Sequence, residues 1–369
     1  MAEAEKLLGE ALAAYDFGGE LVGAVRYGSG HINDTFVVHT QPGEEPCRRF
    51  ILQRISSAAF KHPDEVMANI VGVTKFLGEK IREAGGDPAR ETMSVWATKD
   101  GKNYYTDSEG GAWRVYPFVE DTICLQKAET PELFRASAVA FGKFQRMLKD
   151  YPADTLYETI PKFHDTEDRL AKLKAAVAAD AVGRVKDVTA ELKFVEEREA
   201  DCSVALSALR EGRLPLRVTH NDTKLNNILI DRESGEGICV IDLDTVMPGL
   251  SINDFGDSIR FGANHSAEDE RDLTRVNFDL ELFDVYAAGY LEGAGGALTE
   301  AELDYLPWGA KLMTLECGIR FLTDYLEGDH YFRTHREGQN LDRCRTQFKL
   351  VSDMENAWDK MRAVVDKYR

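Results

Sequence analysis

The hydrophobic pattern of the first third of the chain predicts a sheet with one helix packed against it. Short apolar runs bounded by turn residues are typical of strands, and we expect strands at 24–27, 35–38, 50–55, near 95–96 and at 113–116, after an opening amphipathic helix. Between Val66 and Ile81 the apolar residues recur at spacings of three and four, which predicts a helix with one buried face. Asp100-Gly101 and Gly110-Gly111 mark turns.

From Pro131 onward the pattern becomes mostly helical. We expect helices at 132–148, 167–178, 190–209 and 303–325, with one β-rich insert at 227–230 and 237–242 that turns at Ser234-Gly235. This pattern predicts an α+β protein. Its small N-terminal lobe, 1–117, would hold the sheet, and a short apolar segment at 116–119 would join it to a larger helical lobe, 118–369.

Composition narrows the range of functions. The chain has 369 residues, 43% of them hydrophobic, and 45 basic against 64 acidic residues give a net charge of −19. This field repels nucleic acid and anionic membranes, so a phosphate-bearing ligand must be held by local groups. The N-terminus lacks the pattern of a signal peptide, no stretch is long enough to span a membrane, and six scattered cysteines form no C-x-x-C pair. We expect a cytoplasmic monomer with reduced thiols and no nucleic-acid or membrane partner.

The segment 218–227 carries the most informative motif, His-x-Asp-x-Lys-x-x-Asn, and the strand after it ends in Asp242. Phosphoryl transfer to a hydroxyl needs a carboxylate base and hard oxygen ligands that hold Mg²⁺ on the phosphates. Asp222 is the expected base, and Asn227 and Asp242 are the expected metal ligands. Lys224 would lie beside the transferred phosphoryl group. So short a motif also arises by chance in turns, but the following hairpin favours the catalytic interpretation.

Three neighbouring residues have other expected roles. His220 is expected to hydrogen-bond the loop backbone rather than carry a proton. The triplet at 254–256 spells Asp-Phe-Gly but lies too far beyond Asn227, so Asp254 is expected to accept hydrogen bonds from loop amides, and Asp244 to act as an auxiliary group near the metal.

A glycine-bearing turn lies between the first two expected strands. Gly28, Gly30 and Asn33 occur there with no helix following, which argues against a dinucleotide fold and fits a flap over phosphates. A lone Gly-x-Gly is often only a turn.

The third expected strand lacks a phosphate-binding lysine. Arg54, with Lys61 as a weaker alternative, would have to contact the phosphates of ATP instead. Glu65 and Asn69, near the start of the following helix, are the two open candidates for the residue that would pair with Arg54.

At 220–227 and 240–244 the chain resembles the aminoglycoside phosphotransferase/choline kinase superfamily, and within it most resembles bacterial N-acetylhexosamine 1-kinases. The segments 28–35, 50–55, 113–118, 242–261 and 314–325 share the resemblance. It implies a two-lobed protein-kinase-like fold and transfer of the γ-phosphate of ATP to the anomeric hydroxyl of an N-acetylhexosamine. It also implies that the backbone around Tyr116 and Phe118 receives adenine. The implied sugar contacts are His31, Asp222, Arg320 and Tyr331.

Two alternatives stay open. A kinase of the same fold could act on choline, an aminoglycoside or another small alcohol, and the acidity of the chain would steer cations toward it. An inactive nucleotide-binding scaffold would explain the missing lysine, although the set of Asp222, Lys224, Asn227 and Asp242 is complete. The preference between GlcNAc and GalNAc and the choice of nucleotide are not encoded in any recognisable motif.

Overall fold

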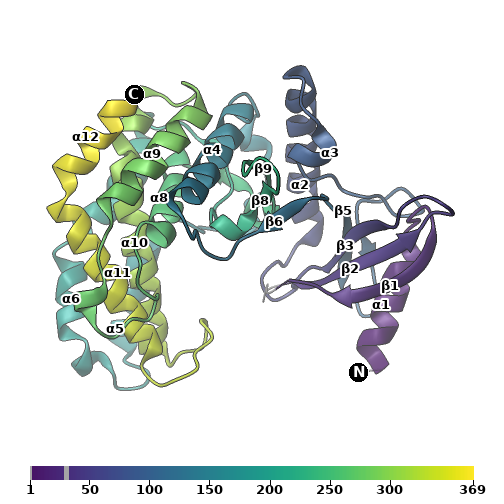
Figure 1. Cartoon of the computed structure of the whole chain (residues 1–369). Helices are drawn as coiled ribbons and strands as arrows, with labels where there is room; N and C mark the ends of the chain where they lie inside the picture. Colours follow the sequence, from purple (N-terminus) through teal and green to yellow (C-terminus); the bar gives the residue numbers. More distant parts are fainter. Residues whose placement is uncertain (1, 29–32) are drawn as a thin grey trace.

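A five-stranded antiparallel sheet forms the centre of the N-terminal lobe (Figure 1). The computed structural model describes residues 2–28 and 33–369. Helix α1 (Ala2–Ala14) covers one face of the sheet, and Leu7 and Ala11 pack there against Trp113 and Val115. The strand order is β1-β2-β3-β5-β4, with β1 Glu20–Arg26, β2 Asp34–Gln41, β3 Arg48–Arg54, β4 Tyr105–Thr106 and β5 Ala112–Pro117.

The strands expected at 24–27, 35–38, 50–55 and 113–116 are confirmed to within a few residues. The strand expected near 95–96 is wrong. Trp96 makes one isolated bridge to Val115, and its indole packs on Phe50 and donates to the carbonyl of Asp16. The aromatic side chain that suggested a strand is half-buried by packing, with one isolated bridge and no strand around it.

Helix α2 (Pro63–Glu83) is the predicted amphipathic helix, and short α3 (Pro88–Glu91) follows it. A proline in its first turn favours the start of the helix, and Val66, Ile70 and Val73 are fully buried. Their cluster includes Tyr116 of the sheet lobe, but also residues of the helical lobe, namely Phe144, Leu148, Val218, Leu243 and Val246. The apolar face of α2 therefore contacts both lobes.

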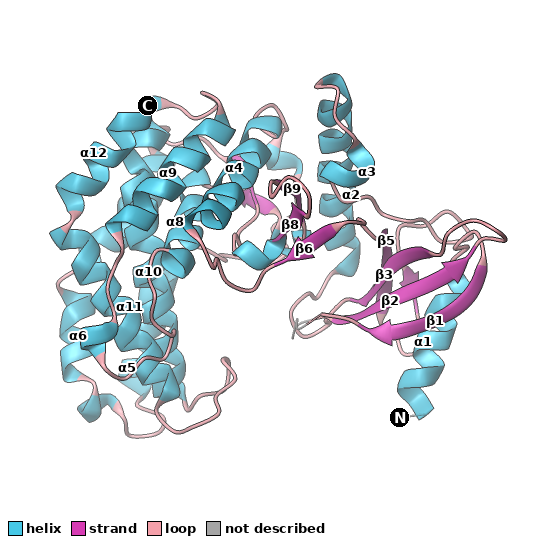
Figure 2. Ribbon diagram, viewed as in Figure 1, coloured by secondary structure: helices cyan, strands magenta, loops and turns pink. Residues whose placement is uncertain are grey.

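After β5 the chain forms two further small sheets. The connecting segment forms β6 (Thr122–Cys124), which pairs with β8 (Ile228–Asp231), and β8 pairs with β9 (Gly237–Val240). Figure 2 shows the sheet of β6, β8 and β9 between the N-terminal sheet and the helices. Strand β7 (Arg217–Thr219) pairs with β10 (Met247–Gly249). The predicted insert corresponds to β8 and β9, whereas three-residue strands such as β6, β7 and β10 are too short to show an alternating pattern.

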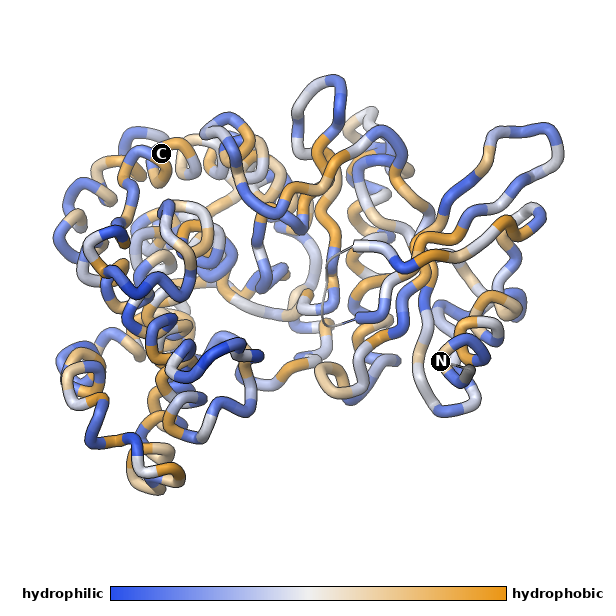
Figure 3. Tube along the Cα trace, turned by 60° about the horizontal axis from the view of Figure 1, so that its bottom comes forward, coloured by the Kyte–Doolittle hydropathy of each residue, from blue (hydrophilic) through white to orange (hydrophobic). Residues whose placement is uncertain are grey.

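The rest of the chain packs as helices around the largest hydrophobic core. Figure 3 shows apolar segments running through this lobe and the sheet, with hydrophilic segments on protruding loops. No helix among the described residues is both long and apolar enough to cross a membrane. The helices are α4 Pro131–Met147, α5 Thr166–Ala179, α6 Thr189–Glu196, α7 Val204–Arg210, α8 Ser251–Gly262, α9 Leu280–Ala294, α10 Glu300–Glu327, α11 Gln339–Asn356 and α12 Trp358–Tyr368.

The single helix expected at 190–209 is wrong, because the chain there divides into α6, a 3₁₀ turn (Glu199–Ser203) and α7. Arg198, at the break, leaves helical geometry and forms a two-pronged ion pair with Glu355 of α11. Phe194 stacks on Phe348 of the same helix. These tertiary contacts outweigh the helical propensity of the segment.

Helix α10 is fixed at its start by a capping box in which Thr299 and Glu302 exchange hydrogen bonds. The buried Glu302 also pairs with Arg217 of β7 and accepts from the hydroxyl of Ser251 of α8. One carboxylate thereby joins α10 to two elements that flank the predicted catalytic loop.

Candidate active site

The predicted catalytic loop follows β7, and its functional side chains lie together. The Asp222 carboxylate pairs with the Lys224 ammonium at 2.7 Å. The side-chain amide nitrogen of Asn227 donates to the backbone carbonyl of Asp222 at 2.8 Å and to its carboxylate at 3.2 Å. With its nitrogen turned to Asp222, Asn227 keeps its amide oxygen for a metal, which is the atom that a hard cation prefers.

His220 connects this loop to the end of β9. It is fully buried; its Nδ1 accepts from the amide of Asp222 at 3.2 Å, and its Nε2 donates to the carbonyl of Ile241 at 2.9 Å. The amide of Ile241 in turn donates to the carbonyl of Asn227. These bonds hold Asp242, the next residue, beside the loop, and they confirm the predicted structural role of His220.

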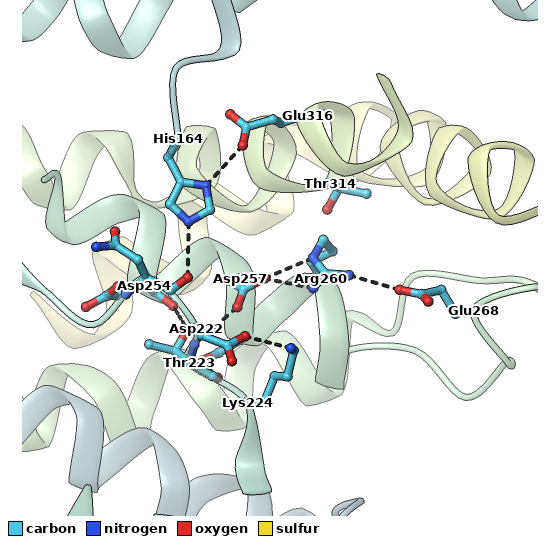
Figure 4. A network of polar contacts seen from close by, with 12 residues as sticks. His164, Asp222, Thr223, Lys224, Asp254, Asp257, Arg260, Glu268, Thr314 and Glu316 are labelled. Carbon is cyan, nitrogen blue, oxygen red and sulfur yellow. Dashed lines mark hydrogen bonds and ion pairs between the residues drawn. The ribbon is translucent and has the colours of Figure 1, made fainter. Parts of the chain in front are cut away.

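Two carboxylates of α8 hold the loop from behind (Figure 4). Asp254 accepts from the amides of His220 and Asn221 at 2.9 and 2.8 Å, so its predicted role as a backbone acceptor is confirmed. Asp257 accepts from the amide of Thr223 and pairs with Arg260. The helix thus fixes the backbone on both sides of Asp222.

Asp242 begins the turn after β9 in the left-handed conformation, with φ of 60°, which is uncommon for a residue with a side chain. Although its side chain reaches solvent, enclosure by the surrounding protein, together with the charges of Asp244 and Asp222, raises the pKa of its carboxyl to about 6. This raised pKa means that the negative charges at 222, 242 and 244 are close enough to repel one another. A divalent cation would relieve that repulsion, and carboxylate and amide oxygens are the donors it prefers. The described residues contain no preformed cluster of three or more acidic, histidine or cysteine ligands, so the metal roles of Asn227 and Asp242 remain predictions.

The glycine-bearing turn is described only in part, because Gly30 and His31 lie outside the described residues. Gly28 has φ of 78° and open space around its Cα, as a turn glycine does. Asn33 faces the helical lobe: its amide nitrogen donates to Asp244 at 2.6 Å and its oxygen accepts from the amide of Ser56. Asn33 therefore connects the base of the turn to the loop after β9, and its predicted contact with nucleotide remains a prediction.

Arg54 does not face the catalytic loop, and the prediction that it contacts the phosphates is not supported. It lies on the α1 face of the sheet, over the Trp113 indole, and pairs with the buried Asp107 at 3.0 Å. A Cβ on Gly111 would collide with both partners, so this glycine permits the pair. The acidic partner that sequence analysis sought at Glu65 or Asn69 is Asp107. Asn69 instead bonds the backbone of Tyr157 and Val246.

The connection expected to receive adenine begins at the end of β5. Tyr116 is buried on the sheet face that turns toward α2, and its hydroxyl has no hydrogen-bond partner among the described residues. The amide of Phe118 donates to the carbonyl of Arg49, so this N–H is not free for adenine. The Phe118 ring lies between the Arg49 guanidinium and the edge of Tyr27. Tyr27, at the end of β1, adds an aromatic ring that sequence analysis missed.

The two remaining predicted sugar contacts lie together at the far end of α10. The Arg320 guanidinium is 3.4 Å from the Tyr331 hydroxyl and lies near the rings of Phe163 and Phe332. Arg320 and Tyr331 line a pocket of about 230 Å³. The loop that carries Tyr331 is held by the buried Asp324, which accepts from the amides of three consecutive residues, 330–332. The pocket is lined by Arg169, Lys172, Arg320, Thr323, Asp324, Glu327, Tyr331 and Phe332.

His164 links that region to the catalytic loop, and no sequence motif pointed to it. Its Nδ1 is 3.0 Å from the carboxylate of Glu316, one turn before Arg320 on α10, and its Nε2 is 3.2 Å from the carbonyl of Asn221 (Figure 4). Both neighbours are acceptors, so this arrangement favours the form of the ring in which both nitrogens carry hydrogen, which is the charged imidazolium. Burial alone would lower the pKa of His164, but the hydrogen bond to Glu316 and its charge outweigh this and raise it.

Comparison with known proteins gives the family and the fold of the chain. The model of the phosphotransferase enzyme family matches residues 23–300. An aminoglycoside phosphotransferase from Alicyclobacillus acidocaldarius is similar in structure (TM-score 0.60, 13% identity, 97% of this chain and 96% of that one). So are a choline kinase from Cryptosporidium parvum Iowa II (0.57, 12%, 99% and 99%) and the amicoumacin kinase hAmiN in complex with AMP-PNP and Ca²⁺ (0.57, 15%, 96% and 93%). At these identities the likeness shows a shared fold, which confirms the predicted two-lobed kinase-like class.

Proposed function

The chain belongs to the phosphotransferase enzyme family, and from this premise we propose that it is a kinase that transfers the γ-phosphate of ATP to a hydroxyl of a small molecule. The observation that carries the proposal is the contact set of Asp222, which joins a carboxylate base, a lysine and an amide ligand within hydrogen-bond distance. The complex of hAmiN with AMP-PNP and Ca²⁺ supports a nucleotide and a divalent cation as co-substrate and cofactor.

Each residue then has a definite task. Asp222 orients the acceptor hydroxyl and takes its proton as the oxygen attacks the γ-phosphorus. Lys224 lies beside the phosphoryl oxygens, where its ammonium offsets their growing charge. Asp242 and the amide oxygen of Asn227 would hold Mg²⁺, which supplies charge neutralisation on the phosphates. His220, Asp254 and Asp257 keep the loop in place without contacting the reactants.

For the acceptor we propose an N-acetylhexosamine, such as GlcNAc or GalNAc, phosphorylated at its anomeric hydroxyl. Arg320 and Tyr331 support it, because a sugar of this kind offers an amide carbonyl and hydroxyls to a guanidinium and a phenol, and a flat apolar face to aromatic rings. Tyr331 is 71% exposed, so its ring is available to a ligand. His31 is proposed as a further sugar contact from the sequence alone.

A cationic acceptor is the second candidate, since the similar structures include a choline kinase and an aminoglycoside phosphotransferase. The pocket that holds Arg320 and Tyr331 weighs against it, because its three cations outnumber its two carboxylates and a net positive charge repels a cation. The cations are Arg169, Lys172 and Arg320, and the carboxylates are Asp324 and Glu327. An inactive scaffold is disfavoured by the complete set of loop contacts.

An acceptor panel tests the proposal. Purified protein with ATP and Mg²⁺ receives GlcNAc, GalNAc, choline or an aminoglycoside, and ADP release is followed, with the Asp222→Asn variant as the blank. We expect turnover on the acetylated sugars only. Turnover only on choline or only on the aminoglycoside would show that the acceptor is cationic. If the protein binds nucleotide but turns over none of the acceptors, the inactive scaffold is supported.

A further inference from the structure

The sheet face that turns toward the catalytic loop carries a buried arginine, Arg114, which has no role in the mechanism proposed above. Arg114 lies on β5, 1% exposed, and its NH1 is 2.5 Å from the carboxylate of Asp244. Arg54, the arginine that sequence analysis favoured for phosphate binding, is on the opposite face. Arg114 is thus a cation of the N-terminal lobe that reaches the loop after β9.

Its neighbour across the sheet is Gln53. The two residues are register partners on β3 and β5, and Nε and NH2 of Arg114 donate to the amide oxygen of Gln53 at 3.1 and 2.9 Å. This fixes the Gln53 amide with its nitrogen outward, where it donates to the Thr35 hydroxyl of β2 at 3.1 Å. Gln53 is half-buried and has a second N–H to offer.

The hydrogen-bonding capacity around Arg114 is not filled. Its NH1 is engaged in the ion pair with Asp244, but the buried hydroxyl of Tyr116, on the same face, has no hydrogen-bond partner among the described residues. A buried hydroxyl left in this state costs free energy, and such groups occur where a ligand completes the site.

We propose that Gln53 and Arg114 together replace the lysine that the third strand lacks: the Gln53 amide contacts the phosphates of the nucleotide, and Arg114 behind it supplies the positive charge and positions both Gln53 and Asp244. The inference rests on the proposed nucleotide-dependent function. It assigns to Gln53 a ligand contact and to Arg114 a positioning role, and it removes the need for Arg54 at the site.

The test separates binding of phosphates from binding of the base. Dissociation constants of Mg²⁺–ADP and of adenosine are measured by calorimetry for the wild type and for Arg114→Gln. We expect at least about a tenfold loss of ADP affinity, since a charge-assisted contact is lost, with adenosine affinity unchanged. Arg54→Gln is the matched control, an arginine of an adjacent strand that also pairs with a buried aspartate, and it should change neither constant.

A charge-relocation variant makes the test decisive. In Gln53→Lys/Arg114→Gln the cation moves to the partner strand, and we expect most of the ADP affinity to return. This variant also keeps a cation near Asp244, so it serves if Arg114→Gln alone does not fold.

Two results would overturn the inference: equal losses for ADP and adenosine in Arg114→Gln, or a double variant that binds ADP as weakly as the single one. A wild type that binds neither ligand would instead overturn the proposed function.

Discussion

At the scale of single residues, the Asp222 carboxylate is the group on which the chemistry depends. Asp222→Asn keeps the size of the side chain and removes its basicity, so we expect kcat to fall by about 10²–10⁴-fold. Affinity for Mg²⁺–ADP should stay nearly unchanged, because the base acts in the transfer step. Steady-state kinetics and calorimetry measure the two effects. Asp284→Asn is the control, a carboxylate paired with Lys367 far from the loop; a variant at 222 with near-normal kcat would exclude Asp222 as the base.

The buried pair of His164 and Glu316 predicts a pH-dependent stability. The pKa of His164 is raised in the folded protein, so the contribution of its charge is complete below its unfolded value of about 6.5 and is lost as pH rises through the folded pKa. Burial would raise the pKa of Glu316, but the hydrogen bond and charge of His164 lower it, so its contribution is lost only as pH falls through the folded value.

We therefore expect His164→Gln to destabilise the protein more at pH 6 than at pH 9, by up to about 1.4 kcal/mol for each pH unit that separates the unfolded from the folded pKa of the histidine. Urea unfolding at both pH values measures this difference. His265→Gln removes an exposed pair with Asp279 and should change stability by less than about 1 kcal/mol at either pH. An equal loss at both pH values for His164→Gln would show that the histidine is uncharged.

The roles of residues that lie at fixed spacings within one loop could be predicted from the sequence. The roles of residues that depend on side-chain direction or on distant partners could not. The offsets between Asp222, Lys224 and Asn227 are set within one loop, so local sequence carries them. Arg54 and Arg114 both lie in strands, and side-chain direction alternates along a strand. The sequence does not show which face of the sheet meets the catalytic loop, and the arginine that its pattern indicates, Arg54, faces α1. His164 was missed because its partners lie 57 and 152 positions away.

At the scale of elements, the crossing of α8 and α10 depends on two glycines. A Cβ on Gly256 would collide with the backbone of Gly309, and a Cβ on Gly309 with that of Ile252. The two helices therefore pack backbone to backbone. Because α8 carries Asp254 and Asp257, the separation of these helices determines where the catalytic loop lies.

We expect Gly309→Ala to lower the free energy of unfolding by about 1–3 kcal/mol, because the added methyl forces the helices apart, and to lower kcat as well. Gly9→Ala is the matched control: Gly9 lies in α1, exposed, with open space around it, so alanine should raise stability by up to about 1 kcal/mol. Urea unfolding measures both variants. A neutral Gly309→Ala would mean that the crossing can widen without strain.

The elements themselves were predictable in proportion to their length and periodicity. Helix α2 and strands β2 and β3 show clear patterns, whereas β6, β7 and β10 have three residues each and are defined only by their partners. The break between α6 and α7 arises from contacts with α11, which local propensity does not contain.

At the scale of the whole molecule, the lobes share more structure than the chain order implies. The predicted boundary after residue 117 stays a prediction, and α2, which precedes it, packs on residues of both lobes. Arg114 and Asn33 add polar contacts from the sheet to Asp244. The connecting chain is itself tied to the helical lobe from β6 onward.

Asn69 of α2 exchanges two hydrogen bonds with the backbone of Tyr157 and gives another to Val246. Separating the helix from the helical lobe would leave these buried groups without hydrogen-bond partners, at a free-energy cost of about 1–3 kcal/mol each. It would also expose the apolar face of the helix. Displacing α2 from the helical lobe is therefore costly, and we expect this helix to keep its position against that lobe when a ligand binds.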